Sequence, residues 1–463
     1  MIKKMAVEII VKLNEPVMIG KTLEKSIPLS DLLPEETAGV IDEHSFWMEE
    51  VTDENKEVLV QFSSDIQQRI PRDEPPSSPR KPAPQNGTIP AAHPSALRYS
   101  CLDQGRNLAR CSGTFTWLIG PSGDLLRKFL LHFDLVQEGE FFQLSPAPHN
   151  FVVIYPDGRI PQRAQYQRAQ ILPHITPDFK IGAYLGDELI CGYNYSKDLD
   201  KPYFYPVRGP SGSYITTVGK PHDPTDSHQH HKSLWIAHQR INGVNFWEEW
   251  PDCGKITHQG FDELVSGPLF ARIVERNRWE RAGRVHAYEK RSFTLYKTPG
   301  SFRYIDIQIE MEPETEGRFA GDLVIGSTIW GFLAIRLKES MTPLDAGGEI
   351  RNSNGQINEH QVIWESAKWC DISGPLKDGL WNGAAIFDNP KNFSFPCGWQ
   401  CRNDGFICSS FSNNGDYVVK MGEKLVVRHR VFLHEGNALG GHVEQAFGDY
   451  VSGYDIDFGL MPE

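Results

Sequence analysis

Histidines, tryptophans and carboxylates gather in one short stretch of this chain. Five of its sixteen histidines lie between Lys220 and Trp250, at positions His222, His228, His230, His231 and His238. The same stretch holds two further tryptophans and four carboxylates, at positions Trp235, Trp247, Asp223, Asp226, Glu248 and Glu249. A packed core does not need this mixture, because a buried polar group costs free energy unless it finds a partner. The stretch is therefore the strongest candidate for a functional site.

The spacing of the histidines suits two different chemistries. In an extended strand, His228 and His230 would point to one side and His231 to the other. Two imidazoles on one side suit a metal ion, with His238, His258 or a carboxylate completing the shell. Neutral imidazoles with a pKa near ~6.5 also suit proton transfer at a sugar hydroxyl or ring oxygen. A third interpretation is a hydrogen-bonded polar loop. We expect the sugar site, without a metal ion or another cofactor.

Five side chains are candidates for binding the substrate of this site. His228 and His238 offer imidazole donors and acceptors, and Trp235 and Trp247 offer rings that pack well against the C–H face of a pyranose. Packing in the core is an equally good interpretation of either tryptophan. Arg208 lies in a turn rich in Pro and Gly, where its fork of donors suits a carboxylate or a pair of hydroxyls. A surface ion pair is the alternative for Arg208.

Four side chains are candidates for acid/base catalysis. His230 and His231 are the expected proton carriers, with Glu248 or Asp371 as the acidic partner. Glu248 and Glu249 are consecutive, so at most one of them is expected to face the site. Asp371 stands before a Ser-Gly-Pro sequence, where its carboxylate also suits the capping of a turn.

Composition and missing motifs exclude several classes of protein. The 47 Lys and Arg residues against 60 Asp and Glu residues give a formal charge of −13. No stretch concentrates basic residues as a phosphate backbone would require, so we expect no nucleic-acid partner. The sequence contains no nucleophile elbow, no Walker loop and no strand-linked dinucleotide fingerprint. The expected partner is a small molecule or an oligosaccharide.

The apolar segments predict a soluble, cytoplasmic protein with no membrane contact. The stretch from Met1 to Lys12 has basic residues before a short apolar run, but Glu8 and Lys12 interrupt it and no small-residue cleavage site follows. We expect a first β-strand there. The most apolar later stretch, residues 323–337, is too short to span a bilayer.

Strand patterns dominate the chain and predict an all-β fold with only short helices, such as one near residues 29–33. Short β-branched or aromatic runs, several of them alternating, occupy residues 7–11, 58–62, 114–118, 302–310 and 417–420. Eight prolines between residues 71 and 94 predict a flexible loop. We expect this loop to lie inside an N-terminal β-sandwich of residues 1–140. A linker of residues 141–174 would then lead to a C-terminal β domain of residues 175–463.

Several C-terminal segments resemble those of the PmoA-like family, bacterial proteins of largely unknown function. The segments are PYFYPVRGPSG at 202–212, HQHHKSLW at 228–235, NGVNFW at 242–247, AIRLKES at 334–340, NSNG at 352–355 and WCDISGP at 369–375. The resemblance covers roughly residues 175–463. This sequence departs from the family where Lys232 and Ser233 stand in place of a glycine, and at residues 325–330, where an acidic stretch is more usual.

The resemblance implies a β-sandwich domain that is often associated with sugar-degrading gene sets. We therefore expect a larger antiparallel β-supersandwich of the galactose-mutarotase type after the N-terminal sandwich. The N-terminal part is similar to the accessory β-sandwiches of some polysaccharide-active proteins. The expected function is a carbohydrate-active enzyme of the hydrolase, lyase or isomerase type. The alternatives are a metal-dependent oxidoreductase with histidine ligands and a non-catalytic glycan-binding protein.

Overall fold

The fold was obtained as a computed structural model. It describes residues 3–28, 32, 40–41, 47–52, 56–58, 60–64, 112–136, 152–155, 181–185, 188–219, 226, 228–265, 269–298 and 300–460. The proline-rich loop expected at residues 71–94 lies outside the described residues. So do His222, Asp223 and most of the short helix expected near residues 29–33.

The chain is mostly β-strand and divides into two compact units. Unit 1 consists of residues 1–151, 266–269 and 452–463, and unit 2 of residues 152–265 and 270–451. All described strand pairs that form the sheets are antiparallel, which agrees with the all-β prediction.

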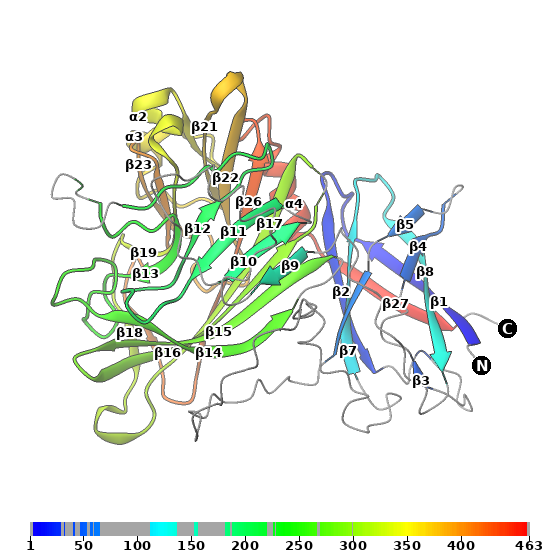
Figure 1. Cartoon of the computed structure of the whole chain (residues 1–463), viewed down its shortest axis with the longest axis horizontal. Coiled ribbons are helices and arrows are strands. Elements are labelled where there is room, and N and C mark those ends of the chain that lie inside the picture. Colours follow the sequence, from blue (N-terminus) through cyan, green and yellow to red (C-terminus); the bar gives the residue numbers. More distant parts are fainter. Residues whose placement is uncertain are drawn as a thin grey trace, which may run out of the picture. The chain divides into compact units, whose positions relative to one another are not determined.

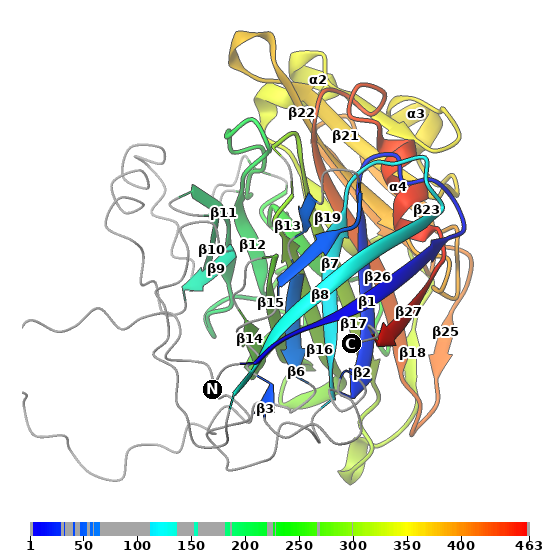
Figure 2. The same cartoon turned by 90° about the vertical axis from the view of Figure 1, so that its right-hand side faces the viewer.

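Unit 1 is a β-sandwich of two sheets. The larger sheet has the order β27-β1-β8-β4-β5, with β3 also paired to β8, and the smaller has the order β2-β7-β6. The strands are β1 (Lys3–Leu13), β2 (Lys21–Pro28), β3 (Val40–Ile41), β4 (Trp47–Glu50), β5 (Lys56–Val58), β6 (Val60–Ser64), β7 (Ser112–Ile119), β8 (Leu126–Val136) and β27 (Tyr454–Leu460). Figure 2 shows β1 and β8 running together across β2 and β7.

Alternating apolar residues form the core of unit 1. Val7, Ile9 and Val11 of β1 are buried at every second position, as a strand with one covered face requires. They share one cluster with Trp117 of β7 and Phe129 of β8, whose rings meet edge to face with centroids 6.1 Å apart. One core therefore joins the two sheets. The first strand, β1, lies where the sequence predicts it.

The last strand of the chain belongs to unit 1, which corrects the expected end of the C-terminal domain at residue 463. β27 pairs with β1 over seven residue pairs, from Val7 with Leu460 to Leu13 with Tyr454 (Figure 1). The expected linker at 141–174 is also corrected, because β9 (Val152–Tyr155) lies within it and pairs with β10 of unit 2. The first correction comes from pairing between the two most distant strands of the chain, and the second from pairing between consecutive strands.

Unit 2 contains two large sheets of eight strands each (Figure 1). The first, which we call the β13 sheet, has the order β23-β24-β19-β13-β12-β11-β10-β9. Its strands are β9, β10 (Ile181–Leu185), β11 (Glu188–Asn194), β12 (Tyr203–Val207), β13 (Leu234–His238), β19 (Gly331–Arg336), β23 (Gly398–Arg402) and β24 (Phe406–Ser410). Two further strands, β18 (Leu323–Ile325) and β25 (Tyr417–Val419), form a separate pair.

The second large sheet, which we call the β17 sheet, has the order β14-β15-β16-β17-β26-β22-β21-β20. Its strands are β14 (Lys255–Val265), β15 (Phe270–Arg281), β16 (Arg284–Tyr296), β17 (Phe302–Glu312), β20 (Glu349–Asn352), β21 (Trp369–Pro375), β22 (Trp381–Asp388) and β26 (Leu425–Glu435). The helices of unit 2 are short: α2 (Pro343–Ala346), α3 (Asn358–Val362) and α4 (Val443–Val451).

One apolar core fills the space between the two sheets of unit 2. Ile305, Ile307 and Ile309 of β17 and Leu234 and Ile236 of β13 are buried members of the same cluster.

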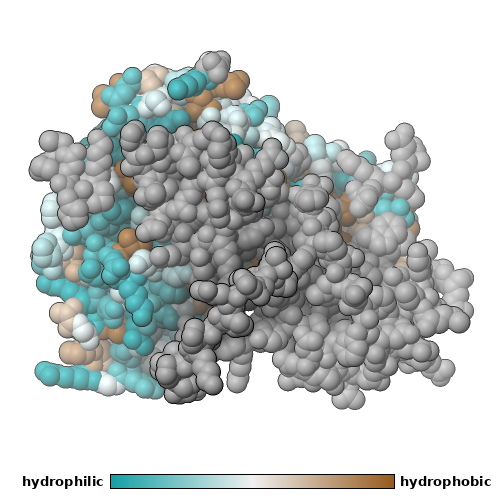
Figure 3. Space-filling model, in the orientation of Figure 1, coloured by the Kyte–Doolittle hydropathy of each residue, from teal (hydrophilic) through white to brown (hydrophobic). Residues whose placement is uncertain are grey.

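Among the described residues, no helix is long and apolar enough to cross a membrane. On the face that Figure 3 shows, the coloured surface is mostly hydrophilic, and hydrophobic residues occur in small groups.

Candidate functional site

A hydrogen-bonded turn carries the three neighbouring histidines. The N–H of His231 donates to the carbonyl oxygen of His228 (2.9 Å), and the His231 carbonyl accepts from the N–H of Gly219 (2.8 Å). Ser233 adopts a left-handed φ of 68° before the chain enters β13. A Cβ on Gly219 would lie 2.2 Å from the His228 carbonyl oxygen, so this close approach requires glycine. The expected strand geometry of the histidines is wrong, because this segment turns.

The turn brings the histidine rings together on an aromatic surface. The ring centroid of His231 lies 4.7 Å from that of His228 and 4.6 Å from that of His230. His231 also stacks on Phe406 of β24, with centroids 4.7 Å apart and planes 23° apart, and lies 5.2 Å from Trp235 of β13. We call the following set the histidine cluster: His228, His230, His231, Trp235, Trp247 and Phe406.

The two candidate tryptophans form the buried wall of the histidine cluster. Trp235 and Trp247 are each 1% exposed, and their ring centroids are 5.5 Å apart. Trp247 meets His230 edge to face at 6.3 Å. The half-buried Trp330 adds a further ring, 5.9 Å from that of Trp247. Core packing therefore accounts for Trp235 and Trp247, while Trp330, His228 and His230 lie nearer the solvent.

Arg336 at the end of β19 links two of the histidines through polar contacts. Its Nη1 lies 2.7 Å from Nδ1 of His231, and its Nη2 donates to Oδ2 of Asp404 (3.3 Å). The same Asp404 oxygen lies 3.5 Å from Nδ1 of His228. Because arginine only donates, Nδ1 of His231 is an acceptor and its proton resides on Nε2. Arg336 therefore fixes the tautomer of His231.

Burial and nearby cations keep the three imidazoles neutral. Burial lowers the pKa of His230 to about 3, and the positive charge of Lys201 acts in the same direction. Burial also lowers the pKa of His231 well below its usual value, together with His230 and Arg336. For His228, burial lowers the pKa and Asp404 opposes that effect. Neutral imidazoles can both donate and accept hydrogen bonds near neutral pH.

A buried lysine fastens Glu249 beside the histidine turn. Lys201 is 1% exposed, and its Nζ donates to the carbonyl oxygen of Trp247 and to Oε1 of Glu249, both at 2.8 Å. Lys232 reaches Oε2 of Glu249 at 2.9 Å. Burial alone would raise the pKa of Glu249. The two lysines together lower it by more than burial raises it, so the pKa of Glu249 is below its usual value. Glu248, the expected acid, instead bonds with Asn245 and is not part of this network.

Three polar atoms of this region are buried and make no hydrogen bond in the described part of the chain. They are Nε2 of His231, Nε1 of Trp235 and Oδ1 of Asp404. Nε2 of His231 carries a proton, because Nδ1 is the acceptor of Arg336. The set thus contains two N–H donors and one acceptor without partners. Such groups cost free energy in a closed core, and a polar ligand or water satisfies them.

His238 and Arg208 have local structural partners instead of facing the histidine cluster. His238 is fully buried, with Nε2 2.9 Å from the hydroxyl of Ser412, and its Nδ1 accepts from the N–H of Arg240. Arg208 bonds with the carbonyl of Gly212 within its own turn and lies 3.3 Å from Glu188. The contact with Glu188 agrees with the interpretation of Arg208 as a member of an ion pair.

Asp371 lies in the β17 sheet and pairs with a different histidine. Its Oδ2 is 2.7 Å from Nε2 of His434 in β26, and both side chains are almost completely buried. The ring of His434 lies over Gly383 of β22, where a Cβ would come within 2.6 Å of Nε2. The expected pairing of Asp371 with the histidine segment is therefore wrong. Asp404 is the carboxylate beside His228.

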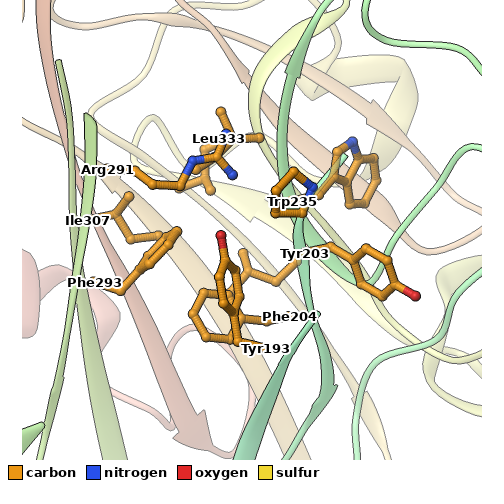
Figure 4. A pocket seen from close by; sticks show the side chains of 11 residues that line it. Tyr193, Tyr203, Phe204, Trp235, Arg291, Phe293, Ile307 and Leu333 are labelled. Atoms are coloured by element: carbon orange, nitrogen blue, oxygen red, sulfur yellow. The ribbon is translucent and has the colours of Figure 1, made fainter. Parts of the chain in front are cut away.

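A charged network and a small cavity lie between the sheets of unit 2. Arg291 of β16 is 1% exposed and donates through Nε to Glu289 (3.0 Å), and Tyr193 of β11 bonds with Glu275 of β15. Figure 4 shows the hydroxyl of Tyr193 pointing toward Arg291, while the ring of Trp235 points away from it. This network belongs to the interior, and the histidine cluster lies on the other side of β13.

Sequence reasoning missed Arg336, Asp404, Lys201 and Phe406, which complete the surroundings of the three histidines. In the sequence, Arg336 stands out only as part of the family-like segment at 334–340. The register that pairs Ala334 with Cys408 and Arg336 with Phe406 brings Arg336 beside Phe406, and residue spacing along the chain does not predict that register.

No group of three His, Cys, Asp or Glu side chains in the described part of the chain is arranged to hold a metal ion.

Comparison with known proteins gives one family and several distant structural likenesses. A family model described as "Family of unknown function (DUF6807)" matches residues 180–448, more than half of the chain. No curated protein matches. A solved structure of a protein in the glycosyl hydrolase family 38 from Enterococcus faecalis is 8% identical, with a TM-score of 0.39. The match covers 99% of this chain and 48% of that chain, so this chain spans about half its length.

Proposed function

The chain belongs to this family of unknown function, and we propose that unit 2 is a carbohydrate-active enzyme domain whose substrate binds at the histidine cluster. One combination of groups carries the proposal: neutral imidazoles, partly open to solvent, beside aromatic rings and beside donors and an acceptor that lack partners. A sugar presents hydroxyls that donate and accept, and C–H faces that pack on aromatic rings. The two sets of groups are complementary.

The residues have separate roles in this proposal. His228 and His230 are the proton carriers, because they form the accessible side of the cluster and His228 keeps 35% of its side chain exposed. Asp404 stabilises the imidazolium that His228 becomes when it takes a proton from the sugar. Arg336 holds Asp404 and His231 in position. The reaction is of the hydrolase, lyase or isomerase type.

The state of Glu249 supports an imidazole mechanism over one that uses two carboxylic acids. A glycosidase acid needs a raised pKa so that it still carries a proton near neutral pH. Glu249 has a lowered pKa, because Lys201 and Lys232 both contact its carboxylate. It therefore stays ionised, and proton transfer falls to His228 and His230.

A non-catalytic glycan-binding protein is the second candidate, and one observation favours it. With a pKa of about 3, His230 is a weak base and binds a sugar hydroxyl more readily than it removes a proton. The stacked rings of the cluster supply binding without any proton transfer. In that case sugars bind and no product forms.

Binding and turnover of a sugar panel test the proposal. The full-length chain is mixed with methyl glycosides and disaccharides of glucose, galactose, mannose, xylose, rhamnose and glucuronic acid. Saturation-transfer NMR reports binding and one-dimensional spectra report products. We expect one sugar class to bind and react, and His228→Ala or His230→Ala to weaken binding roughly tenfold, the loss of one good hydrogen bond with its packing.

The matched control is His360→Ala, because His360 is exposed on α3 and lies outside the histidine cluster. This variant keeps wild-type binding and turnover. We also expect turnover to survive dialysis against a chelator. The proposal fails if no sugar binds, or if His228→Ala and His230→Ala bind sugar as the wild type does. Binding without product selects the second candidate.

A further inference from the structure

Trp250 keeps an exposed indole ring three residues beyond Trp247 of the histidine cluster. Of the tryptophans whose side chains the structure describes, only Trp250 and Trp364 are more than half exposed, at 60% and 61%. Burial of so large an apolar ring would stabilise the fold, and an exposed ring does not make this contribution. An exposed tryptophan on a held loop therefore suggests a contact with a ligand.

The loop that carries Trp250 is braced by hydrogen bonds at both ends. Oδ1 of Asn245 accepts from the N–H groups of Trp247 (2.9 Å) and Glu248 (3.3 Å). The N–H of Gly254 donates to the carbonyl of Asn245 (2.8 Å), and the N–H of Cys253 donates to that of Trp250 (2.9 Å). The backbone under the exposed indole is thus fixed, and little conformational entropy is lost when a ligand stacks on it.

The same loop is tied to the histidine turn by buried charge. Lys201 bonds to the carbonyl of Trp247 and to the carboxylate of Glu249, and that carboxylate also binds Lys232, which directly follows His231 in the chain. Trp250 is the next residue after Glu249. The chain therefore places the exposed indole one residue beyond the ion pair that joins the loop to the turn.

We propose that Trp250 is an outer sugar-stacking position, so that the ligand of the histidine cluster is an oligosaccharide and not a single sugar. This inference rests on the proposed function and specifies its substrate class. One sugar unit occupies the cluster beside His228 and His230, and a following unit packs its C–H face on the indole of Trp250. The stacking adds binding free energy only to ligands long enough to reach it.

The test compares a short and a long ligand on the full-length chain. The ligands are the methyl glycoside that binds best in the sugar panel and the linear tetrasaccharide of the same sugar, with affinities measured by calorimetry. We expect Trp250→Ala to weaken the tetrasaccharide roughly tenfold and to leave the methyl glycoside unchanged. Trp364→Ala is the matched control, since it removes an equally exposed indole, and it leaves both affinities unchanged.

Fluorescence gives a second readout that does not depend on how Trp250→Ala folds. In a Trp364→Phe background, Trp250 is the most exposed of the described tryptophans, so acrylamide quenches it first. The tetrasaccharide protects it from quenching, and the methyl glycoside does not. Equal tetrasaccharide affinity in Trp250→Ala and wild type overturns this inference while the proposed function stands. Failure of both ligands to bind the wild type overturns both.

Discussion

At the scale of single residues, the contacts of Arg336 decide what the histidine cluster can do. Its guanidinium faces Nδ1 of His231 and a carboxylate oxygen of Asp404, so one cation orders two groups of the site. Its side chain is only 13% exposed, where water screens these interactions weakly. Removing it leaves His231 buried with two nitrogens lacking partners.

Arg336→Ala is expected to lower the free energy of unfolding by about 1.5–3 kcal/mol, the range for a buried hydrogen bond to a charged group. Urea unfolding measures this loss. In ¹⁵N NMR of the imidazoles, we expect His231 to change from the Nε2–H tautomer alone to a mixture.

Arg276→Ala is the control for Arg336→Ala, because Arg276 is 57% exposed and pairs with Asp262 at the surface. Such pairs contribute little, so its effect is expected to stay below about 1 kcal/mol. An unchanged tautomer of His231 in Arg336→Ala contradicts the role assigned to Arg336.

At the scale of elements, the first sheet of the chain depends on its last strand. β27 is the edge strand beside β1, and Lys21 of β2 also donates to the carbonyl of Ser452 at 2.6 Å. Lys21 is 2% exposed, so its ammonium needs hydrogen-bond acceptors, and the carbonyl and hydroxyl oxygens of Ser452 are two of them. Unit 1 therefore completes its sandwich only when both ends of the chain are present.

Truncation after Val451 is expected to destabilise unit 1 and to spare unit 2. The change removes β27 and a partner of Lys21, and a loss of about 2 kcal/mol lowers the melting temperature of a unit of this length by roughly 4–8 °C. Calorimetry measures the two transitions. Truncation after Leu460 serves as control, and the peptide 452–463 added in trans should restore part of the loss. If truncation after Val451 leaves the melting of unit 1 unchanged, unit 1 does not depend on β27.

At the scale of the whole molecule, buried neutral histidines make stability depend on pH. Burial lowers the pKa of His238 to about 3 and also lowers those of His231 and His429. The unfolded chain takes up these protons near pH ~6.5, whereas the folded chain does not. Stability is therefore complete above this pH and falls as the pH drops toward the folded pKa values.

Between pH 7.5 and pH 5, the free energy of unfolding should decrease with a slope that steepens below pH ~6.5. Each such histidine costs about 1.4 kcal/mol per pH unit, or about 2 kcal/mol by pH 5. Urea titrations at pH 7.5, 6.0 and 5.0 measure the slope. His360→Ala, which changes an exposed histidine, leaves it unaltered. A flat profile over this range rules out the neutral buried state.

The sequence alone determined the all-β character and many strand positions, because alternation of apolar residues is a local property. β1, β7 and β17 lie where alternating runs predict them. The sequence also singled out the histidine-rich stretch, since that mixture of residues has no place in an ordinary core. His228, His230, His231 and Trp247 do gather in one cluster.

Only the tertiary structure decided which groups complete that cluster. His231 meets Arg336, which is 105 positions away in sequence, because β13 pairs with β19 in one particular register. Asp371 was expected there, yet β21 lies in the β17 sheet and gives its carboxylate to His434. Strand order and register are set by the packing of the whole unit. Residue spacing along the chain does not encode strand order or register, so the partners of a histidine in this cluster appear only in the fold.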